Sequence, residues 1–256
     1  MVDGRSREAV RNRVSSPAAE LAVLVVLVVV AAACGGGGPD HVVPSGIIET
    51  QTVDLADFTT VTAGGAFQLE LTLGDTFEVE VSADDNLLPL VEVERHGEAL
   101  DLGIKGRVSI DGNATLKAAI QLPALRGLHL DGASRATLNG FREPEGVEIE
   151  ASGASFVGGE LSAGTLTAVL SGASRVSLEG FALSGDLTAS GASRLELLRF
   201  DLASAVIDVS GASYAEVSVR DEITRAKASG ASTIVYKGGA DVGKLDVSGA
   251  SSVSEY

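Results

Sequence analysis

The chain has 256 residues, a formal net charge of −16, three histidines and one cysteine. The negative charge argues against sequence-independent binding to nucleic acid, because such binding needs a basic surface. A single cysteine excludes an internal disulfide. Glycine is abundant, with 31 residues, and aromatic residues make up only 4%. This composition favours short strands and tight turns over long helices with bulky cores.

The N-terminus has the pattern of an export signal. Four arginines (Arg5, Arg7, Arg11 and Arg13) precede an unbroken apolar run over residues 21–33. This run is short for a membrane-spanning helix, which needs ~20 apolar residues. A basic region, an apolar run and small residues in that order are typical of a secretory signal. We therefore predict a signal peptide over residues 1–33.

The only cysteine, Cys34, directly follows Ala31, Ala32 and Ala33. This arrangement resembles the cleavage box of bacterial lipoproteins, although Ala31 stands where leucine is usual. The alternative is an ordinary signal peptide followed by an incidental cysteine. From its position we predict that Cys34 is lipidated, and two acyl chains there would give a stable membrane anchor. We also predict that residues 34–46, which include the lipidated cysteine, are a flexible glycine-rich tether. The protein would then be exported and lipid-anchored at the bacterial cell envelope or surface.

Residues 47–125 are predicted to form strands and hairpins. The segment "FQLELTLGDTFEVEVSA" alternates in polarity about Gly74 and Asp75, a pair that favours turns. A second alternating segment, "LVEVERHGEALDLGI", has its turn at His96, Gly97 and Glu98. A further strand, "ATLKAAIQLPAL", follows. We expect these hairpins to stack on the N-terminal end of the part that comes next.

Residues 126–256 contain a repeated Gly-Ala-Ser triplet at intervals of 19 to 21 residues. Self-similarity at a fixed period indicates a repeat architecture. Each repeat has two alternating apolar and polar runs and no helical periodicity. The seven triplets begin at Gly132, Gly153, Gly172, Gly191, Gly211, Gly230 and Gly249.

The positions two and four residues before each triplet glycine are apolar in every repeat, and so is the position four residues after it. Alternation with a period of two predicts strands on both sides of the triplet. A unit of about 20 residues cannot bury its apolar face alone, but stacked units can. The sequence therefore predicts an all-β fold, a right-handed parallel β-helix-like solenoid of seven Gly-Ala-Ser coils. It forms one domain, residues 47–256, with the preceding hairpins.

The triplet itself allows two geometries. Glycine suits a position where backbones approach closely or φ is positive. The apolar alternation is not broken across the triplet, which favours a continuous strand with the glycine and serine inward and the alanine outward. The alternative is a corner, in which case the unbroken alternation is accidental. Phe141, Phe181 and Phe200 recur later in three of the coils, and we expect them to fill the opposite corner.

The order of these features resembles a known family. The segments "DFTTVTAGGAFQLELTLGDTFEVEVSADDNLLPLVEVE" and "AAIQLPALRGLHLDGAS", followed by the serial Ser-Gly-Ala-Ser units, are similar to the head GIN domain family, also described as an auto-transporter adhesin. The resemblance extends from Val53 to about Val253. It implies an exported, all-β, β-helix-like bacterial protein that is often a lipoprotein. The family has no established catalytic residues, so none can be assigned here.

We predict that the protein is not an enzyme and has no cofactor or metal site. β-Helix enzymes that cleave acidic polysaccharides need clustered carboxylates and a basic residue. The nearest approach to such a cluster is "REPEGVEIE", where only two of the four glutamates share a strand face. These four glutamates are Glu143, Glu145, Glu148 and Glu150. An enzyme acting on polysaccharide remains the less favoured alternative.

One outward column carries the residue types that binding sites favour. The position three residues after the triplet glycine holds Arg or an aromatic residue in five of the seven coils, and both types are enriched at binding hot spots. This binding stripe consists of Arg135, Phe156, Arg175, Arg194 and Tyr214. It predicts a non-catalytic binding or adhesion scaffold with a glycan or protein surface ligand. The alternatives are an ordinary salt-bridged surface, with Glu196 and Glu216 as partners, and a purely structural envelope spacer.

Overall fold

Strands make up most of the computed structural model, which describes residues 40–256. Within this range the only helical segment is a 3-10 turn, η1 (Leu88–Leu90), and no helix could span a membrane. The strands are β1 (Asp40–Val42), β2 (Ile48–Thr52), β3 (Thr60–Ala63), β4 (Gln68–Leu73), β5 (Glu78–Asp84), β6 (Val91–His96), β7 (Ala99–Ile104), β8 (Val108–Ile110), β9 (Leu116–Leu122), β10 (Gly127–Leu130), β11 (Arg135–Glu143), β12 (Val147–Ala151), β13 (Phe156–Leu170), β14 (Arg175–Ala189), β15 (Arg194–Val209), β16 (Tyr214–Ala228), β17 (Thr233–Lys237), β18 (Asp241–Val247) and β19 (Ser252–Glu255).

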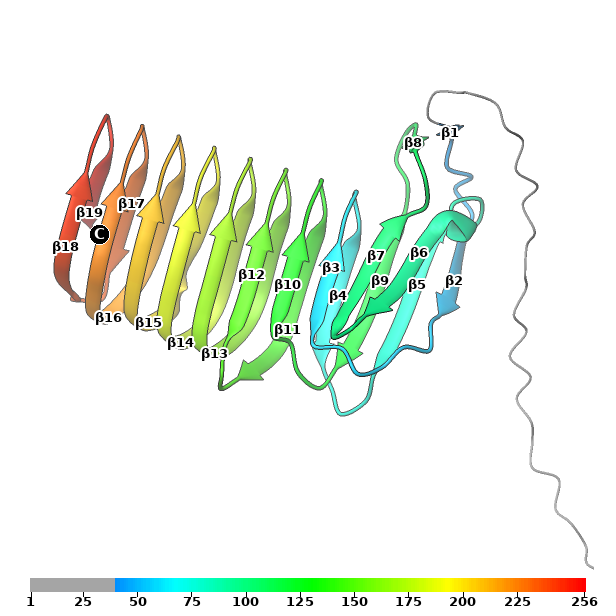
Figure 1. Cartoon of the computed structure of the whole chain (residues 1–256), viewed down its shortest axis with the longest axis horizontal. Helices are drawn as coiled ribbons and strands as arrows, with labels where there is room; N and C mark the ends of the chain where they lie inside the picture. The colour runs from blue at the N-terminus through cyan, green and yellow to red at the C-terminus, as the bar shows by residue number, and fades with distance from the viewer. Residues whose placement is uncertain (1–39) are drawn as a thin grey trace, which may run out of the picture. The chain divides into compact units, whose positions relative to one another are not determined.

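The repeats form a β-solenoid, as predicted. From β10 to β17 every strand pairs in parallel with the strand one coil further along the chain, so the coils stack side by side along one axis (Figure 1). The pairing of β13 with β14 aligns Val157 with Val176 and Ala168 with Leu187. Residues at the same place in successive repeats are therefore neighbours in the ladder.

The apolar columns form the core. The positions two and four residues before the triplet glycine are at most 2% exposed in the first six coils. In the last coil the same positions hold Leu245 and Val247, which are 52% and 45% exposed. Leu245 pairs with Ala226 of the preceding coil, and within residues 40–256 no later coil covers it. The burial of each column therefore depends on having a coil on both sides.

The Gly-Ala-Ser triplet is a corner. Strand structure stops at each triplet, and Gly191 has a φ of +75°, a conformation that glycine adopts without strain. Gly191 and Ala192 are exposed, whereas Ser193 is buried. The prediction of a continuous strand with an inward glycine is therefore wrong. The unbroken apolar alternation is accidental, because the turn changes the chain direction between the two strands.

The corners stack on one another through the backbone. The N–H of Ala192 donates to the carbonyl oxygen of Gly172 in the preceding coil, with an N···O distance of 2.7 Å. The same bond recurs from Ala133 and Gly65 (2.6 Å) to Ala250 and Gly230 (2.7 Å). The inward serines are only partly satisfied. Some hydroxyls bond to the backbone, as Ser193 does to the Ser190 carbonyl at 2.7 Å, but three have no partner in the structure: Ser134, Ser155 and Ser174.

The first coils do not follow chain order. Strands β3 and β4 form a coil that lies between β7 and β9 on one side and β10 and β11 on the other. The predicted hairpin about Gly74 and Asp75 does not form, because β9 pairs with both β4 (in parallel) and β5 (antiparallel) and so separates them. The second predicted hairpin is confirmed: β6 and β7 are antiparallel, with His96 opposite Ala99.

Antiparallel strands cover the N-terminal end of the solenoid. Strand β6 pairs with β7, β5 pairs with β9, and β2 pairs with β5. Residues 40–46, predicted as part of the tether, belong to this folded body. Strand β1 pairs in parallel with β8, and the Gly46 N–H donates to the buried Asp84 carboxylate at 2.7 Å. A second N–H, from Thr115, bonds to Asp84 at 2.8 Å, and these bonds lower the pKa of Asp84. Cys34 and the predicted signal peptide lie outside the described residues.

Candidate functional site

The solenoid places the binding stripe on one outer face. The ladder aligns Arg135 of β11 with Phe156 of β13, and Phe156 with Arg175 of β14. It continues from Arg175 to Arg194 of β15 and to Tyr214 of β16. The three arginines are exposed and the two aromatic side chains are half-buried. The five residues are therefore adjacent, one from each of five successive coils.

The arginines of the stripe have two kinds of contact, with an aromatic ring or with a carboxylate. The Arg135 guanidinium lies over the Phe156 ring and the Arg194 guanidinium over the Tyr214 ring, each 5.0 Å from the ring centroid. Arg175 instead forms a hydrogen-bonded ion pair with Glu196, which raises the pKa of the Arg175 guanidinium. Arg194 is 4.0 Å from the same carboxylate. The C-terminal half of the stripe is thus partly neutralised, as the salt-bridged alternative requires.

Two further residues belong to the same ladder but were not predicted. Gln68 of β4 aligns with Arg135, and Lys117 of β9 aligns with Gln68. The Gly-Ala-Ser repeat gives no sign of them, because β4 and β9 contain no triplet and are out of chain order. Gly158 leaves room for the Phe156 ring of the stripe, since a Cβ atom there would lie 2.8 Å from Cζ of Phe156. The Phe156 ring therefore lies over Gly158 and fills the space that a side chain would take.

A hollow of about 460 Å³ opens at the N-terminal end of the stripe. Lys117, Gln68 and Arg135 line one part of it, and Glu70 and Glu80 line another. Its lining also includes two small side chains, Ala119 and Thr137. Cationic, amide and carboxylate groups thus share one concave surface.

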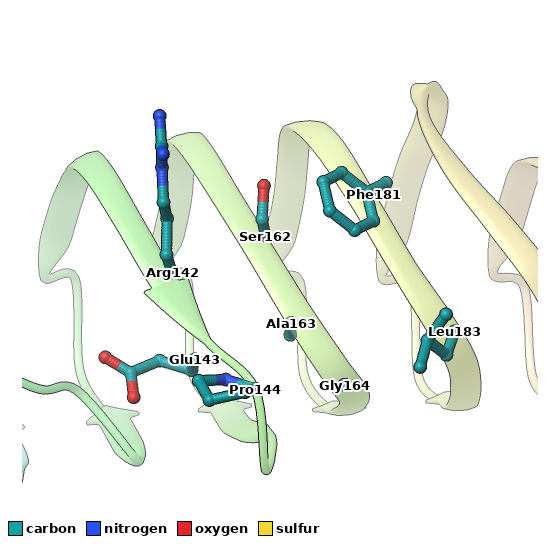
Figure 2. A pocket seen from close by; sticks show the side chains of 8 residues that line it. All are labelled: Arg142, Glu143, Pro144, Ser162, Ala163, Gly164, Phe181 and Leu183. Atoms are coloured by element: carbon teal, nitrogen blue, oxygen red, sulfur yellow. The ribbon is translucent and has the colours of Figure 1, made fainter.

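A second, apolar groove of about 580 Å³ crosses β11, β13 and β14 (Figure 2). Arg142, Ser162 and Phe181 are ladder neighbours along it, and Phe181 and Leu183 project from β14 with 55% and 64% exposure. The prediction that Phe181 fills a core corner is therefore wrong, although Phe141 and Phe200 are buried.

The ladder explains why Phe181 faces outward. Phe141, Leu161, Gly180 and Phe200 align in successive coils. Gly180 takes the place in that column which a large apolar side chain occupies in the neighbouring coils. Phe181 comes one position later and so points to the opposite face of the strand. Sequence similarity between "LEGF" and "LLRF" did not reveal this difference in register.

Within residues 40–256 the four glutamates of "REPEGVEIE" do not gather into one cluster. No group of three or more metal-ligating side chains occurs among residues 40–256. Glu145 pairs with Arg126. Glu143 is 7% exposed and accepts a hydrogen bond from the Leu125 N–H at 2.8 Å.

Burial raises the pKa of Glu143, and the Leu125 bond only partly offsets this. The folded state therefore binds the Glu143 proton more tightly than the unfolded state, and this contribution to stability is lost as pH rises through the folded pKa. We expect Glu143→Gln, which keeps an acceptor for the Leu125 N–H, to have a higher Tm than wild type at pH 7.5, with the difference shrinking toward pH 4. Thermal melts at both pH values test this, and an equal difference at the two would contradict it.

The sequence over residues 57–240 matches the family described as "Putative auto-transporter adhesin, head GIN domain". The chain belongs to the head GIN domain family. No curated protein matches the sequence. Among solved structures, this head GIN domain protein is similar to a "putative adhesin" from Bacteroides fragilis, with a TM-score of 0.79 and 21% identity over 84% of this chain and 100% of the other.

Two proteins from Parabacteroides distasonis have the same fold as this head GIN domain protein. One is a "putative adhesin", with a TM-score of 0.70 and 20% identity over 85% of this chain and 100% of that one. The other is a "putative lipid binding protein", with a TM-score of 0.65 and 18% identity over the same shares of the two chains. Neither the family nor these neighbours is named as an enzyme. At these identities the likeness establishes the fold.

Proposed function

We propose that this protein is a non-catalytic binding scaffold, exported and held at the bacterial cell envelope by lipid on Cys34, and that the binding stripe contacts a surface ligand. The observation that carries the proposal is the stripe itself. Five arginine and aromatic residues from five coils lie in one ladder, on a rigid solenoid whose spacing is set by backbone hydrogen bonds. The names of the family and of its structural neighbours, adhesin and lipid-binding protein, support a binding role.

The acidic surface outside the binding stripe favours selective binding of a matching ligand over tight binding of many ligands. The chain has 35 acidic and 19 basic residues, so the stripe is a cationic and aromatic strip on an acidic body. Such a body repels acidic molecules that do not match the stripe. The lipid anchor would hold the domain at the membrane through residues 35–39, since residues 40–46 are part of the folded body.

The proposed ligand contact is tested with the full-length protein on an array of glycans and matrix proteins. The triple variant Arg135→Ala, Arg175→Ala, Tyr214→Ala should lose about tenfold or more in affinity for any ligand found, because it removes three contacts, one from every second coil of the stripe. Its Tm should change by less than about 4 °C, since both arginine side chains are exposed and Tyr214 is only half-buried. Unchanged affinity would move the contact away from the stripe. The absence of any ligand would favour the structural spacer.

The anchor is tested separately. Radiolabelled palmitate should be incorporated into the wild-type protein and not into Cys34→Ser when both are expressed in a bacterium with lipoprotein processing. The variant should also leave the membrane fraction, because it loses both acyl chains. Equal labelling of the two proteins would show that Cys34 is not the lipidated residue, without bearing on the stripe.

A further inference from the structure

The ladder of the binding stripe extends toward the N-terminal end, where its cations are spaced regularly. Lys117 and Arg135 lie on either side of Gln68, two strand spacings or about 9.6 Å apart. Arg135 and Arg175 lie on either side of Phe156 at the same interval. Positive side chains thus occupy alternate coils over five successive strands, separated first by an amide and then by an aromatic ring.

The two cations nearest the N-terminal end have no acidic partner. Within residues 40–256, neither Lys117 nor Arg135 forms an ion pair, whereas Arg175 is paired with Glu196. Arg135 is held by the ring of Phe156, which orients the guanidinium and leaves its N–H groups free to donate. Both side chains are exposed. An incoming anion would therefore meet unpartnered charge here rather than displace an existing carboxylate.

The hollow beside these cations also contains acceptors. Glu70 and Glu80 line it and form no ion pair within the described part of the chain. The Asn139 amide approaches Glu70 at 3.4 Å, so most of the carboxylate's lone pairs remain available. A ligand that fits must offer a negative group to Lys117 and Arg135 and hydroxyl or amide donors to Glu70 and Glu80. An inorganic anion offers only the first.

We propose that this hollow binds a carboxylate-bearing sugar of a linear acidic polysaccharide, whose chain then runs along the stripe. A sugar acid carries both groups on one ring, a carboxylate for the cations and hydroxyls for the glutamates. A sugar unit in an extended polysaccharide advances by close to one strand spacing of ~4.8 Å. A polymer with a negative group on every second sugar would therefore place these groups at Lys117 and Arg135, and the next one beside Arg175, where it would share the guanidinium with Glu196. This inference rests on the proposed function of the stripe.

The test uses the full-length protein and titration calorimetry at one fixed ionic strength. The probes are hyaluronan oligosaccharides, which carry a carboxylate on alternate sugars, the same oligosaccharides with the carboxyl groups reduced, and poly-glutamate. We expect binding to hyaluronan, about tenfold weaker binding after carboxyl reduction, and weaker binding still to poly-glutamate. Lys117→Gln and Arg135→Gln should each weaken hyaluronan binding about tenfold, since each removes a charge-assisted hydrogen bond.

Two further variants make the result specific. Glu70→Gln should weaken hyaluronan binding, because it replaces one charged acceptor oxygen with an N–H donor and leaves a weaker neutral acceptor, although it makes the protein less negative. A nonspecific electrostatic contact would instead be strengthened. Arg225→Gln is the matched control, since Arg225 is exposed, lies further along β16 than Tyr214 and aligns with Val206 of β15 and Lys244 of β18 rather than with the binding stripe. It should leave affinity within about twofold, because it removes the same charge away from the hollow.

The outcomes separate this inference from the proposed function. An array ligand whose binding depends on Arg175 and Tyr214 but not on Lys117 or Glu70 would overturn the proposed sugar site in the hollow. It would leave the binding stripe as the proposed ligand contact. Binding to poly-glutamate as strong as to hyaluronan would overturn the assignment to an acidic sugar. No binding to hyaluronan would overturn the spacing of negative groups proposed here. Loss of binding in the Arg225 variant equal to that in Lys117→Gln would show that only net charge matters.

Discussion

Gly191→Ala is expected to destabilise the protein by about 3–5 kcal/mol, among the largest effects of a single methyl group. Two causes add. Alanine at a φ of +75° costs about 1–2 kcal/mol. The new Cβ would also lie 2.5 Å from the carbonyl oxygen of Gly172, so the backbone of two coils must move apart. That movement weakens the hydrogen bond from Ala192 to Gly172, which sets the stacking distance at the corner.

Gly65→Ala is the matched control for this prediction. Gly65 begins the same row of corners and has a φ of +80°, but a Cβ there would meet nothing within 4 Å. It should therefore cost only the conformational part, about 1–2 kcal/mol. Urea denaturation at 25 °C measures both variants. Equal losses would show that the corners are strained turns that do not depend on close stacking.

Phe200→Ala is expected to cost about 3–5 kcal/mol, because it empties a fully buried site. The coil before Phe200 presents Gly180 in the same column, so no larger side chain from that coil can fill the space. Phe181→Ala is the control, with the same change of residue at a position that is 55% exposed. It should change stability by no more than about 0.5–1 kcal/mol.

The pair also tests the register of the two coils. The repeat alignment places Phe181 and Phe200 in equivalent positions, whereas the ladder aligns Phe200 with Gly180. Thermal melts that show similar large losses for both variants would contradict the outward orientation of Phe181. A small loss for Phe181→Ala would instead leave the apolar groove open to direct binding measurements with that variant.

The sequence predicted the solenoid because its signal is strictly local and repeated. Leu187 and Ala189 are buried in the coil that ends at Gly191, and the same alternation places Leu195 inside after it. The corner could not be predicted from alternation, since a turn with one positive φ preserves the alternation that a straight strand would show. The three serines Ser134, Ser155 and Ser174 were expected inside, but their unpaired hydroxyls were not expected.

The parts that sequence reasoning missed depend on contacts between distant segments. The segment from Gln68 to Asp84 looks like a hairpin, but β9 provides a partner for each of its strands, and this choice depends on which apolar surfaces remain uncovered. The placement of Gln68 and Lys117 in the stripe follows from that same exchange. Five stripe residues could be found from the triplet period, while the two that extend the stripe required the order of the coils.

The row of corner hydrogen bonds also bears on how such a protein can change over generations. From the coil of Gly132 to that of Gly230, each coil presents the same glycine carbonyl to the next coil and receives the same alanine N–H from it. A duplicated or deleted coil would therefore find the same corner hydrogen bonds on both sides, although columns that combine large and small side chains, such as Phe200 beside Gly180, would also have to match. Gene-level gain or loss of one repeat would lengthen or shorten the outer face by one strand spacing, ~4.8 Å. The length of the solenoid can then evolve in fixed steps, while the antiparallel strands that cover its N-terminal end stay unchanged.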